Sequence, residues 1–172
     1  MKLFSSLLLS TALSANALAA APTQIEELYG SIARDGAKAV VTRLFDDRAK
    51  WDTLISHISS AEPDWVSLGI ALLPGSDAGA TSEIHDALFS ALGVDPAGLL
   101  HRPSSPNFDI VEICNGRDDP PATYNAAQSE QLAVRRKVAA LGAEFGDRRR
   151  LCLAALDSGL QDIERFYDVD AK

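Results

Sequence analysis

The sequence has few aromatic residues, few histidines and only two cysteines. Of its 172 residues 6% are aromatic and three are histidine, at positions 57, 85 and 101. No two histidines have the spacing of a zinc-binding helix, and Glu83, His85 and Asp86 lie at helical positions that do not converge. A phosphate-binding glycine loop and the G-x-S-x-G motif of serine hydrolases are also missing. The sequence therefore predicts no metal, no cofactor and no catalytic residue.

Basic residues are outnumbered by acidic ones, 16 to 24, which gives a net charge of −8. A chain this acidic repels phosphate, so we expect no nucleic-acid binding. The excess lies in residues 21–130, which hold 17 acidic and 7 basic residues, whereas residues 131–172 are nearly balanced. An acidic surface of this kind favours a basic protein partner, although solubility alone is an alternative explanation.

No hydrophobic run is long enough to cross a membrane. The longest, residues 3–13, follows Lys2 and precedes a small-residue stretch in which Ala17 and Ala19 fit the signal-peptidase rule. We interpret residues 1–20 as a cleaved secretory signal and residues 21–172 as a single domain with a charge of −9. The alternative, an N-terminal membrane anchor, needs about 20 apolar residues. We expect no stable membrane insertion.

The two cysteines, Cys114 and Cys152, would enter an oxidising compartment after export. Two is the smallest number that forms an internal disulfide, and both cysteines have apolar neighbours typical of a core. Such a bond would contribute roughly 3–4 kcal/mol by restricting the unfolded chain. The alternative is two separately buried thiols.

Apolar residues recur every three or four positions through nearly the whole chain after residue 21, and no stretch alternates as a strand does. The sequence therefore predicts an all-α fold of about seven to nine helices, either an irregular multi-helix bundle or a short solenoid of helical pairs. The last two helices are expected at about residues 124–145 and 148–167.

Two pairs of residues are candidate binding sites. Residues 115–122 are the most polar and least periodic stretch, and we expect them to form an exposed, mobile loop whose tip, Asp118 and Asp119, contacts a partner. Trp51 and Trp65 could line a ligand pocket. Both lie on apolar helical stripes, however, so packing between two helices is the favoured interpretation.

Several packing and capping motifs resemble a group of small exported helical proteins of proteobacteria. The resemblance covers about residues 51–156 and implies a helical, periplasmic protein but no activity. At the level of class, the chain is similar to periplasmic immunity proteins that neutralise toxins acting on the cell envelope. The motifs are Trp51-x-x-Leu54-Ile55, Asp64-Trp65-x-x-Leu68, Ser76-Asp77-Ala78-Gly79-Ala80, Leu88-x-x-Ala91-Leu92 and Asp95-Pro96-x-x-Leu99-Leu100.

The sequence favours a non-enzymatic periplasmic protein-interaction module, in its most specific form an immunity or inhibitor protein that binds a basic partner. Two alternatives remain at this point. One is a hydrolase that acts on the envelope with a pair of carboxylates, which are abundant in the chain. The other is a small-ligand-binding protein with a pocket near Trp51 and Trp65.

Overall fold

Helices account for all of the regular secondary structure in the part of the chain that is described. The computed structural model describes residues 23–167, which hold nine α-helices, two short 3-10 helices and no strand. The all-α prediction is therefore confirmed. The α-helices are α1 (Gln24–Asp35), α2 (Ala37–Asp46), α3 (Arg48–Ser59), α4 (Pro63–Leu72), α5 (Ala78–Val94), α6 (Pro96–His101), α7 (Ile110–Cys114), α8 (Tyr124–Ala139) and α9 (Gly146–Phe166), with 3-10 helices at Leu73–Gly75 and Ala143–Phe145.

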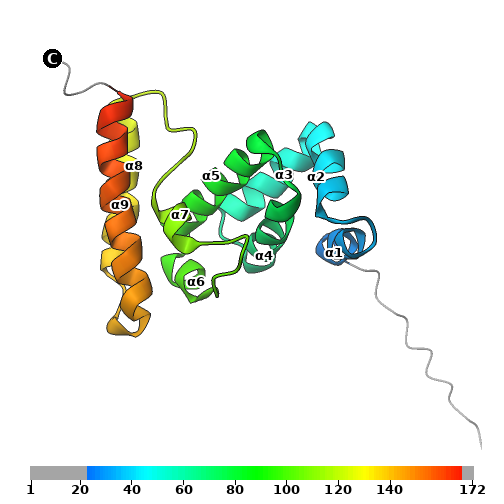
Figure 1. Ribbon diagram of the computed structural model, residues 1–172, viewed down its shortest axis with the longest axis horizontal. Helices are drawn as coiled ribbons and strands as arrows, with labels where there is room; N and C mark the ends of the chain where they lie inside the picture. Colours follow the sequence, from blue (N-terminus) through cyan, green and yellow to red (C-terminus); the bar gives the residue numbers. More distant parts are fainter. Residues whose placement is uncertain (1–22, 168–172) are drawn as a thin grey trace, which may run out of the picture.

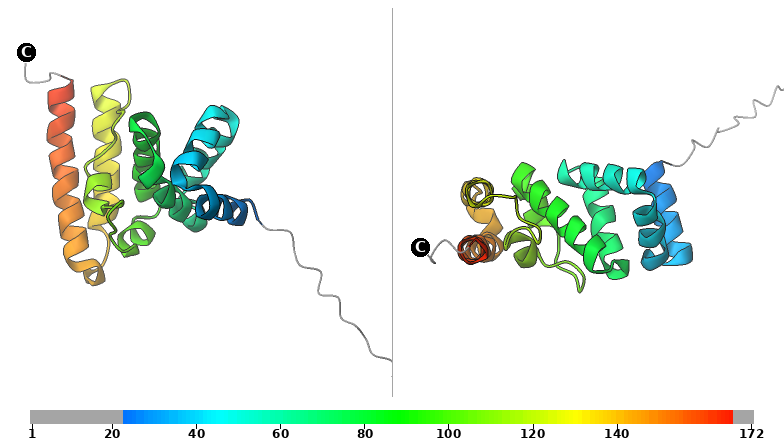
Figure 2. Two further views of the ribbon diagram at one scale, coloured as in Figure 1. Left: turned by 45° about the vertical axis from the view of Figure 1, so that its right-hand side comes forward. Right: turned by 90° about the horizontal axis from the view of Figure 1, so that it is seen from above.

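The helices follow one another along the molecule in nearly the order of the sequence (Figure 1). Helices α1 and α2 lie at one end, α3, α4 and α5 follow, and the antiparallel pair α8 and α9 stands at the other end (Figures 1 and 2). Short α6 and α7 lie between, where α5 contacts both of them and α7 contacts α9. The result is an irregular bundle of helical pairs with one continuous apolar core.

Side-chain caps explain where several of the helices begin. Thr23 and Glu26 form a capping box at the start of α1, in which each side chain accepts a hydrogen bond from the other residue's backbone N–H. Four aspartates accept backbone hydrogen bonds at the starts of α3, α5, α6 and α7, where a carboxylate also complements the helix dipole. These aspartates are Asp47, Asp77, Asp95 and Asp109.

Both tryptophans belong to the core. Trp51 is completely buried, and its Nε1 donates to Oε2 of Glu83 at 2.7 Å. Glu83 also accepts two hydrogen bonds of 2.9 Å from Arg48, so a buried indole is joined to an ion pair at the surface. Trp65 is 8% exposed and stacks on His57 with 4.4 Å between ring centroids. The structure thus gives the two indoles packing roles, as the favoured interpretation expected.

The C-terminal helices differ from the prediction at their junction. One helix was expected over about residues 124–145, but α8 ends at Ala139 and a 3-10 turn at Ala143–Phe145 leads into α9. The guanidinium of Arg149 explains the early end, because it donates to the carbonyl oxygens of Val138 and Ala139 at 3.3 and 2.6 Å. The carbonyl of Val138 also accepts from the backbone N–H of Leu141, so the last carbonyls of α8 are satisfied jointly by the following turn and by α9.

Among the helices of residues 23–167, none has both the length and the hydrophobicity needed to cross a bilayer. The predicted signal peptide at residues 1–20 lies outside the described residues.

Candidate functional site

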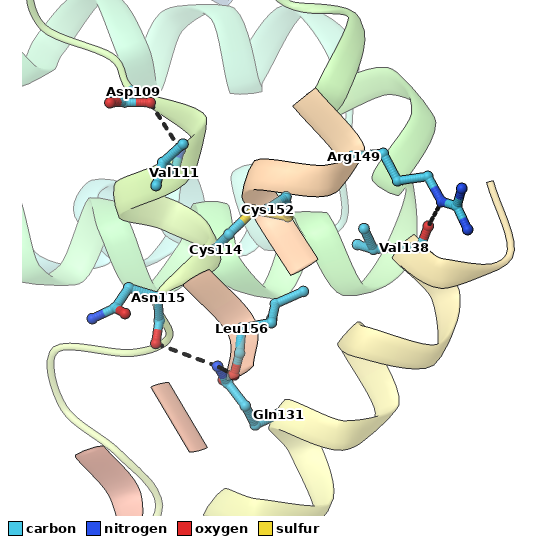
Figure 3. The surroundings of a disulfide bond; sticks show 9 residues. All are labelled: Asp109, Val111, Cys114, Asn115, Gln131, Val138, Arg149, Cys152 and Leu156. Carbon is cyan, nitrogen blue, oxygen red and sulfur yellow. Dashed lines mark hydrogen bonds between the residues drawn. A yellow bond between two sulfur atoms is a disulfide. The ribbon is translucent and has the colours of Figure 1, made fainter. Parts of the chain in front are cut away.

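A disulfide joins α7 to α9 at the point where the chain leaves α7. Cys114 is bonded to Cys152, 38 residues further on, and both are fully buried (Figure 3). The predicted disulfide is therefore present. From α8, the buried amide of Gln131 donates to the carbonyl oxygens of Asn115 and Leu156 at 3.3 and 3.1 Å (Figure 3). Three helices are thus fixed to one another beneath the segment that follows.

That segment, residues 115–122, is the loop that connects α7 to α8 (Figure 1). Arg117 anchors it: the guanidinium forms two hydrogen bonds with the carboxylate of Glu130, at 2.9 and 2.7 Å, and reaches Ser90 Oγ at 2.8 Å. A further bond of 3.3 Å goes to the carbonyl oxygen of Asp86. The expectation of an exposed loop is wrong at Arg117, whose side chain is only 23% exposed, because bidentate pairing with Glu130 holds it against α5 and α8.

Asp86 on α5 holds the loop at a second point. Its Oδ1 accepts a hydrogen bond from the backbone N–H of Asp118 at 2.8 Å, and Oδ2 of Asp118 accepts one from Ser82 at 3.1 Å. The Asp86 side chain is 16% exposed. Its burial raises the pKa of its carboxyl above the ordinary 3.8, and the hydrogen bond from Asp118 and the charge of Arg117 only partly oppose this.

The raised pKa of Asp86 predicts a pH dependence of stability. A carboxyl whose folded-state pKa lies above its unfolded value stabilises the fold below the unfolded pKa, and this contribution is lost as pH rises through the folded pKa. In Asp86→Asn the amide oxygen still accepts from Asp118 but no charge is buried. We therefore expect wild type to lose stability relative to this variant as pH rises from about 3.5 through the pKa of Asp86, as measured by urea unfolding at pH 3.5, 5 and 7. If wild type instead gained stability relative to Asp86→Asn as pH rises, the charge of Arg117 would have a larger effect on the pKa of Asp86 than burial has.

A pocket of about 150 Å³ opens between the loop, α8 and α9. Its walls are largely apolar and come from distant parts of the sequence, with Phe166 at 67% the most exposed large apolar side chain among them. Tyr167 follows and donates from its hydroxyl to the carbonyl oxygen of Pro121, which ties the end of α9 to the loop. The apolar lining consists of Phe89, Pro120, Pro121, Ala127, Ile163 and Phe166.

The charged groups of the pocket are unequal in number. Three carboxylates and one guanidinium line it: Asp118, Glu130, Asp162 and Arg117. The guanidinium is already paired with Glu130. Asp162 forms an ion pair of 3.0 Å with Arg165, but both side chains are exposed, at 46% and 69%, and such pairs contribute little. The pocket therefore has a negative excess that arises from Asp118 and Asp162.

No family model, curated protein or solved structure matches the chain. What the site can do follows from its own groups, of which Asp86 and Asp118 are neighbouring carboxylates. A hydrolase of the predicted alternative type needs two carboxyls that face one cleft. Asp118 lines the pocket but Asp86 does not, and Oδ1 of Asp86 is occupied by a backbone N–H. The Asp86–Asp118 pair therefore anchors the loop and does not face one cleft. The carboxylates that share the pocket are Asp118, Asp162 and Glu130, of which Glu130 is paired with Arg117.

The histidines and other metal-binding residue types do not gather in the described part of the chain. His85 Nδ1 lies 3.7 Å from Oδ2 of Asp118, but residues 23–167 contain no group of three or more His, Cys, Asp or Glu side chains that could hold a metal ion. His85 and Asp118 instead belong to an open surface hollow beside the loop.

The predicted partner-binding residues are exposed, although Asp118 also lines the pocket and its carboxylate accepts from Ser82. Asp118 is 49% exposed at its side chain, and Asp119 is also exposed. Trp51 and Trp65 do not line the pocket. Phe166 and Asp162 of α9 were not predicted as site residues, because no local pattern shows that the end of α9 meets the loop.

Proposed function

We propose that the protein is an exported, non-enzymatic protein-interaction module that binds a basic partner through the 115–122 loop and the neighbouring pocket. An immunity or inhibitor protein of the periplasm is the most specific form of this proposal. The signal-peptide pattern of residues 1–20 supports export, and a disulfide suits an oxidising compartment.

The observation that carries the proposal is the fixed position of two exposed carboxylates. Asp118 and Asp119 are exposed on a loop that Arg117, Asp86 and the disulfide hold in place, and the carboxylate of Asp118 is oriented by Ser82. A loop already held in one conformation has less conformational entropy to lose when a partner binds. Exposed charges of one sign attract an oppositely charged partner and raise its association rate.

Removing the two loop charges tests the proposal. We expect Asp118→Asn combined with Asp119→Asn to slow association with a partner isolated from envelope extract by about tenfold at low salt, with a smaller effect on dissociation. The difference should shrink as salt rises, because screening weakens the attraction between exposed charges. Biolayer interferometry at several salt concentrations gives both rates.

A matched control removes two exposed carboxylates elsewhere. Asp46 on α2 and Asp147 in the first turn of α9 are exposed and do not line the pocket. The variant Asp46→Asn with Asp147→Asn has the same net charge as the loop variant, so it should associate at close to the wild-type rate. Equal rates for both double variants would refute a role of the loop, and failure to isolate any stoichiometric partner would refute the proposal as a whole.

A further inference from the structure

We propose that the pocket between the loop, α8 and α9 binds the side chain of one lysine or arginine residue that the partner presents. This inference rests on the proposed function and deepens it, because it assigns the pocket an occupant that the loop charges alone do not specify. The occupant has an apolar stem and a cationic head, and the pocket offers a surface for each.

The apolar walls suit the stem. Phe89, Pro120, Pro121 and Ile163 line the pocket, whose volume of about 150 Å³ is that of a single side chain rather than of a larger ligand. A cavity of this size holds a group as large as benzene. Lysine and arginine bury their methylene stems against such surfaces while the charged head stays at the polar edge.

The charges of the pocket favour a cation over an anion. Arg117, the one guanidinium that lines the pocket within residues 23–167, makes four hydrogen bonds to Glu130, Ser90 and the Asp86 carbonyl, so an anion could recruit it only by breaking them. In contrast, Asp162 is held only by the exposed side chain of Arg165 on its own helix. A cation from the partner can replace that contact at little cost.

The exposed ring of Phe166 supplies a further contact. It lines the pocket, although two thirds of its surface is accessible to solvent. A large exposed aromatic side chain beside a pocket is typical of residues that contribute strongly to binding. The ring face attracts a lysine or arginine cation that lies within about 6 Å of its centroid.

The walls of the pocket are joined to one another by close contacts and by the disulfide. Gly116 lines it with a φ of +125°, and Gly159 contributes from α9 in close contact with Asn115. The disulfide, one residue before Asn115, fixes the distance between these two walls. A pocket with fixed walls does not have to be ordered on binding.

Titration with single capped amino acids tests the pocket directly. We expect N-acetyl-arginine amide and N-acetyl-lysine amide to shift the backbone amide signals of Gly116 and Gly159 in ¹H–¹⁵N NMR spectra, with Kd values on the order of 1–10 mM. N-acetyl-norleucine amide has a stem but no charge, and N-acetyl-glutamate amide has the wrong charge. Neither should give a saturable shift. Equal binding of the norleucine probe, or no shift with either cationic probe, would overturn the proposal.

Variants at the exposed wall locate the site. Phe166→Ala and Asp162→Asn change exposed or half-buried side chains of α9, and each should weaken binding of the arginine probe at least about threefold. Leu151→Ala and Asp147→Asn remove an exposed apolar group and an exposed carboxylate from the same helix, outside the pocket. These controls should bind as wild type does. Wild-type binding by both pocket variants would place the cation elsewhere and overturn the assignment.

The two proposals can fail separately. If the probes do not bind but the loop variant still slows association with the partner, the protein-interaction function stands and the pocket assignment is wrong. If the arginine probe binds, Phe166→Ala should also weaken the partner complex.

Spermidine, a free amine, provides the remaining comparison. If it bound at the same amides more than about 100-fold tighter than the arginine probe, the ligand would be a free amine, and a side chain of the partner would be ruled out as the occupant.

Discussion

Replacing Cys114 and Cys152 together with alanine is expected to lower the free energy of unfolding by about 3–4 kcal/mol. The disulfide closes a segment of 38 residues, and without it the unfolded chain gains conformational entropy. Both sulfur atoms are fully buried, so lost packing adds to the effect. Urea unfolding followed by circular dichroism at 25 °C measures the change. The slope of free energy against urea should rise, because the unfolded variant exposes more surface than a cross-linked chain.

Reduction of the wild-type protein is the matched comparison, since it breaks the bond without changing the sequence. Reduced wild type should unfold at a urea concentration close to that of the double variant. The unfolded chain should contain no reactive thiol until reductant is added. A loss of less than about 1 kcal/mol would show that the bond contributes far less than its segment length predicts.

Gly159→Ala is expected to destabilise the protein by about 3 kcal/mol, the upper end of the range for added volume in a packed core. A Cβ atom at this position would lie 1.9 Å from the Asn115 carbonyl oxygen and 2.4 Å from Nε2 of Gln131. Asn115 cannot move away freely because its neighbour, Cys114, is bonded to α9. The better helix propensity of alanine offsets at most about 1 kcal/mol. Thermal unfolding measures the loss of stability, and the backbone amide NMR signal of Gly116 reports on the pocket locally.

Gly30→Ala provides the control for helix propensity. Gly30 lies within α1, and the nearest atom to its added Cβ would be the flexible end of Arg34, at 3.3 Å. This variant should be as stable as wild type or slightly more stable. The loss of stability caused by Gly159→Ala should also be smaller in a protein without the disulfide, because the effects of substitutions at residues that share a contact are not additive. An equal cost in both backgrounds would mean that the disulfide does not hold Asn115 against α9.

Local signals in the sequence accounted for most of the fold. Each aspartate or threonine cap acts within three residues, so Thr23, Asp47 and Asp95 could be recognised without tertiary information. The apolar stripes likewise predicted the buried faces, including those of Trp51 and Trp65. A pattern with a period of 3.6 residues depends only on neighbours in the chain.

The junction of the last two helices was not predictable in the same way. The apolar pattern continues past Ala139, but the helix ends there because Arg149 satisfies its last carbonyls. That contact joins residues ten or eleven positions apart and exists only once α9 has folded back along α8 (Figure 2). The period of the apolar residues does not show that α9 will pack against α8.

The candidate site was predictable only in part. Asp118 and Asp119 were found because their segment is polar and lacks periodicity. Arg117 looked like one more polar residue of that segment, since its partners Ser90 and Glu130 lie 27 and 13 positions away. The pocket walls span from Phe89 to Phe166 and come together only in the folded chain. The two cysteines gave the one sequence signal that these regions meet.

The position of the disulfide also sets an order of assembly. Helices α1 to α6 contact mainly one another, between helices at most three apart in the chain, so they can pack before the last helices are available. Cys114 has one possible internal partner, and with two cysteines in the chain no wrong internal pairing can form. That partner is in α9, so the bond can close only after nearly all of the chain is available to an oxidant. We therefore expect the region of the pocket to be the last part of the protein to form, without a phase of disulfide rearrangement.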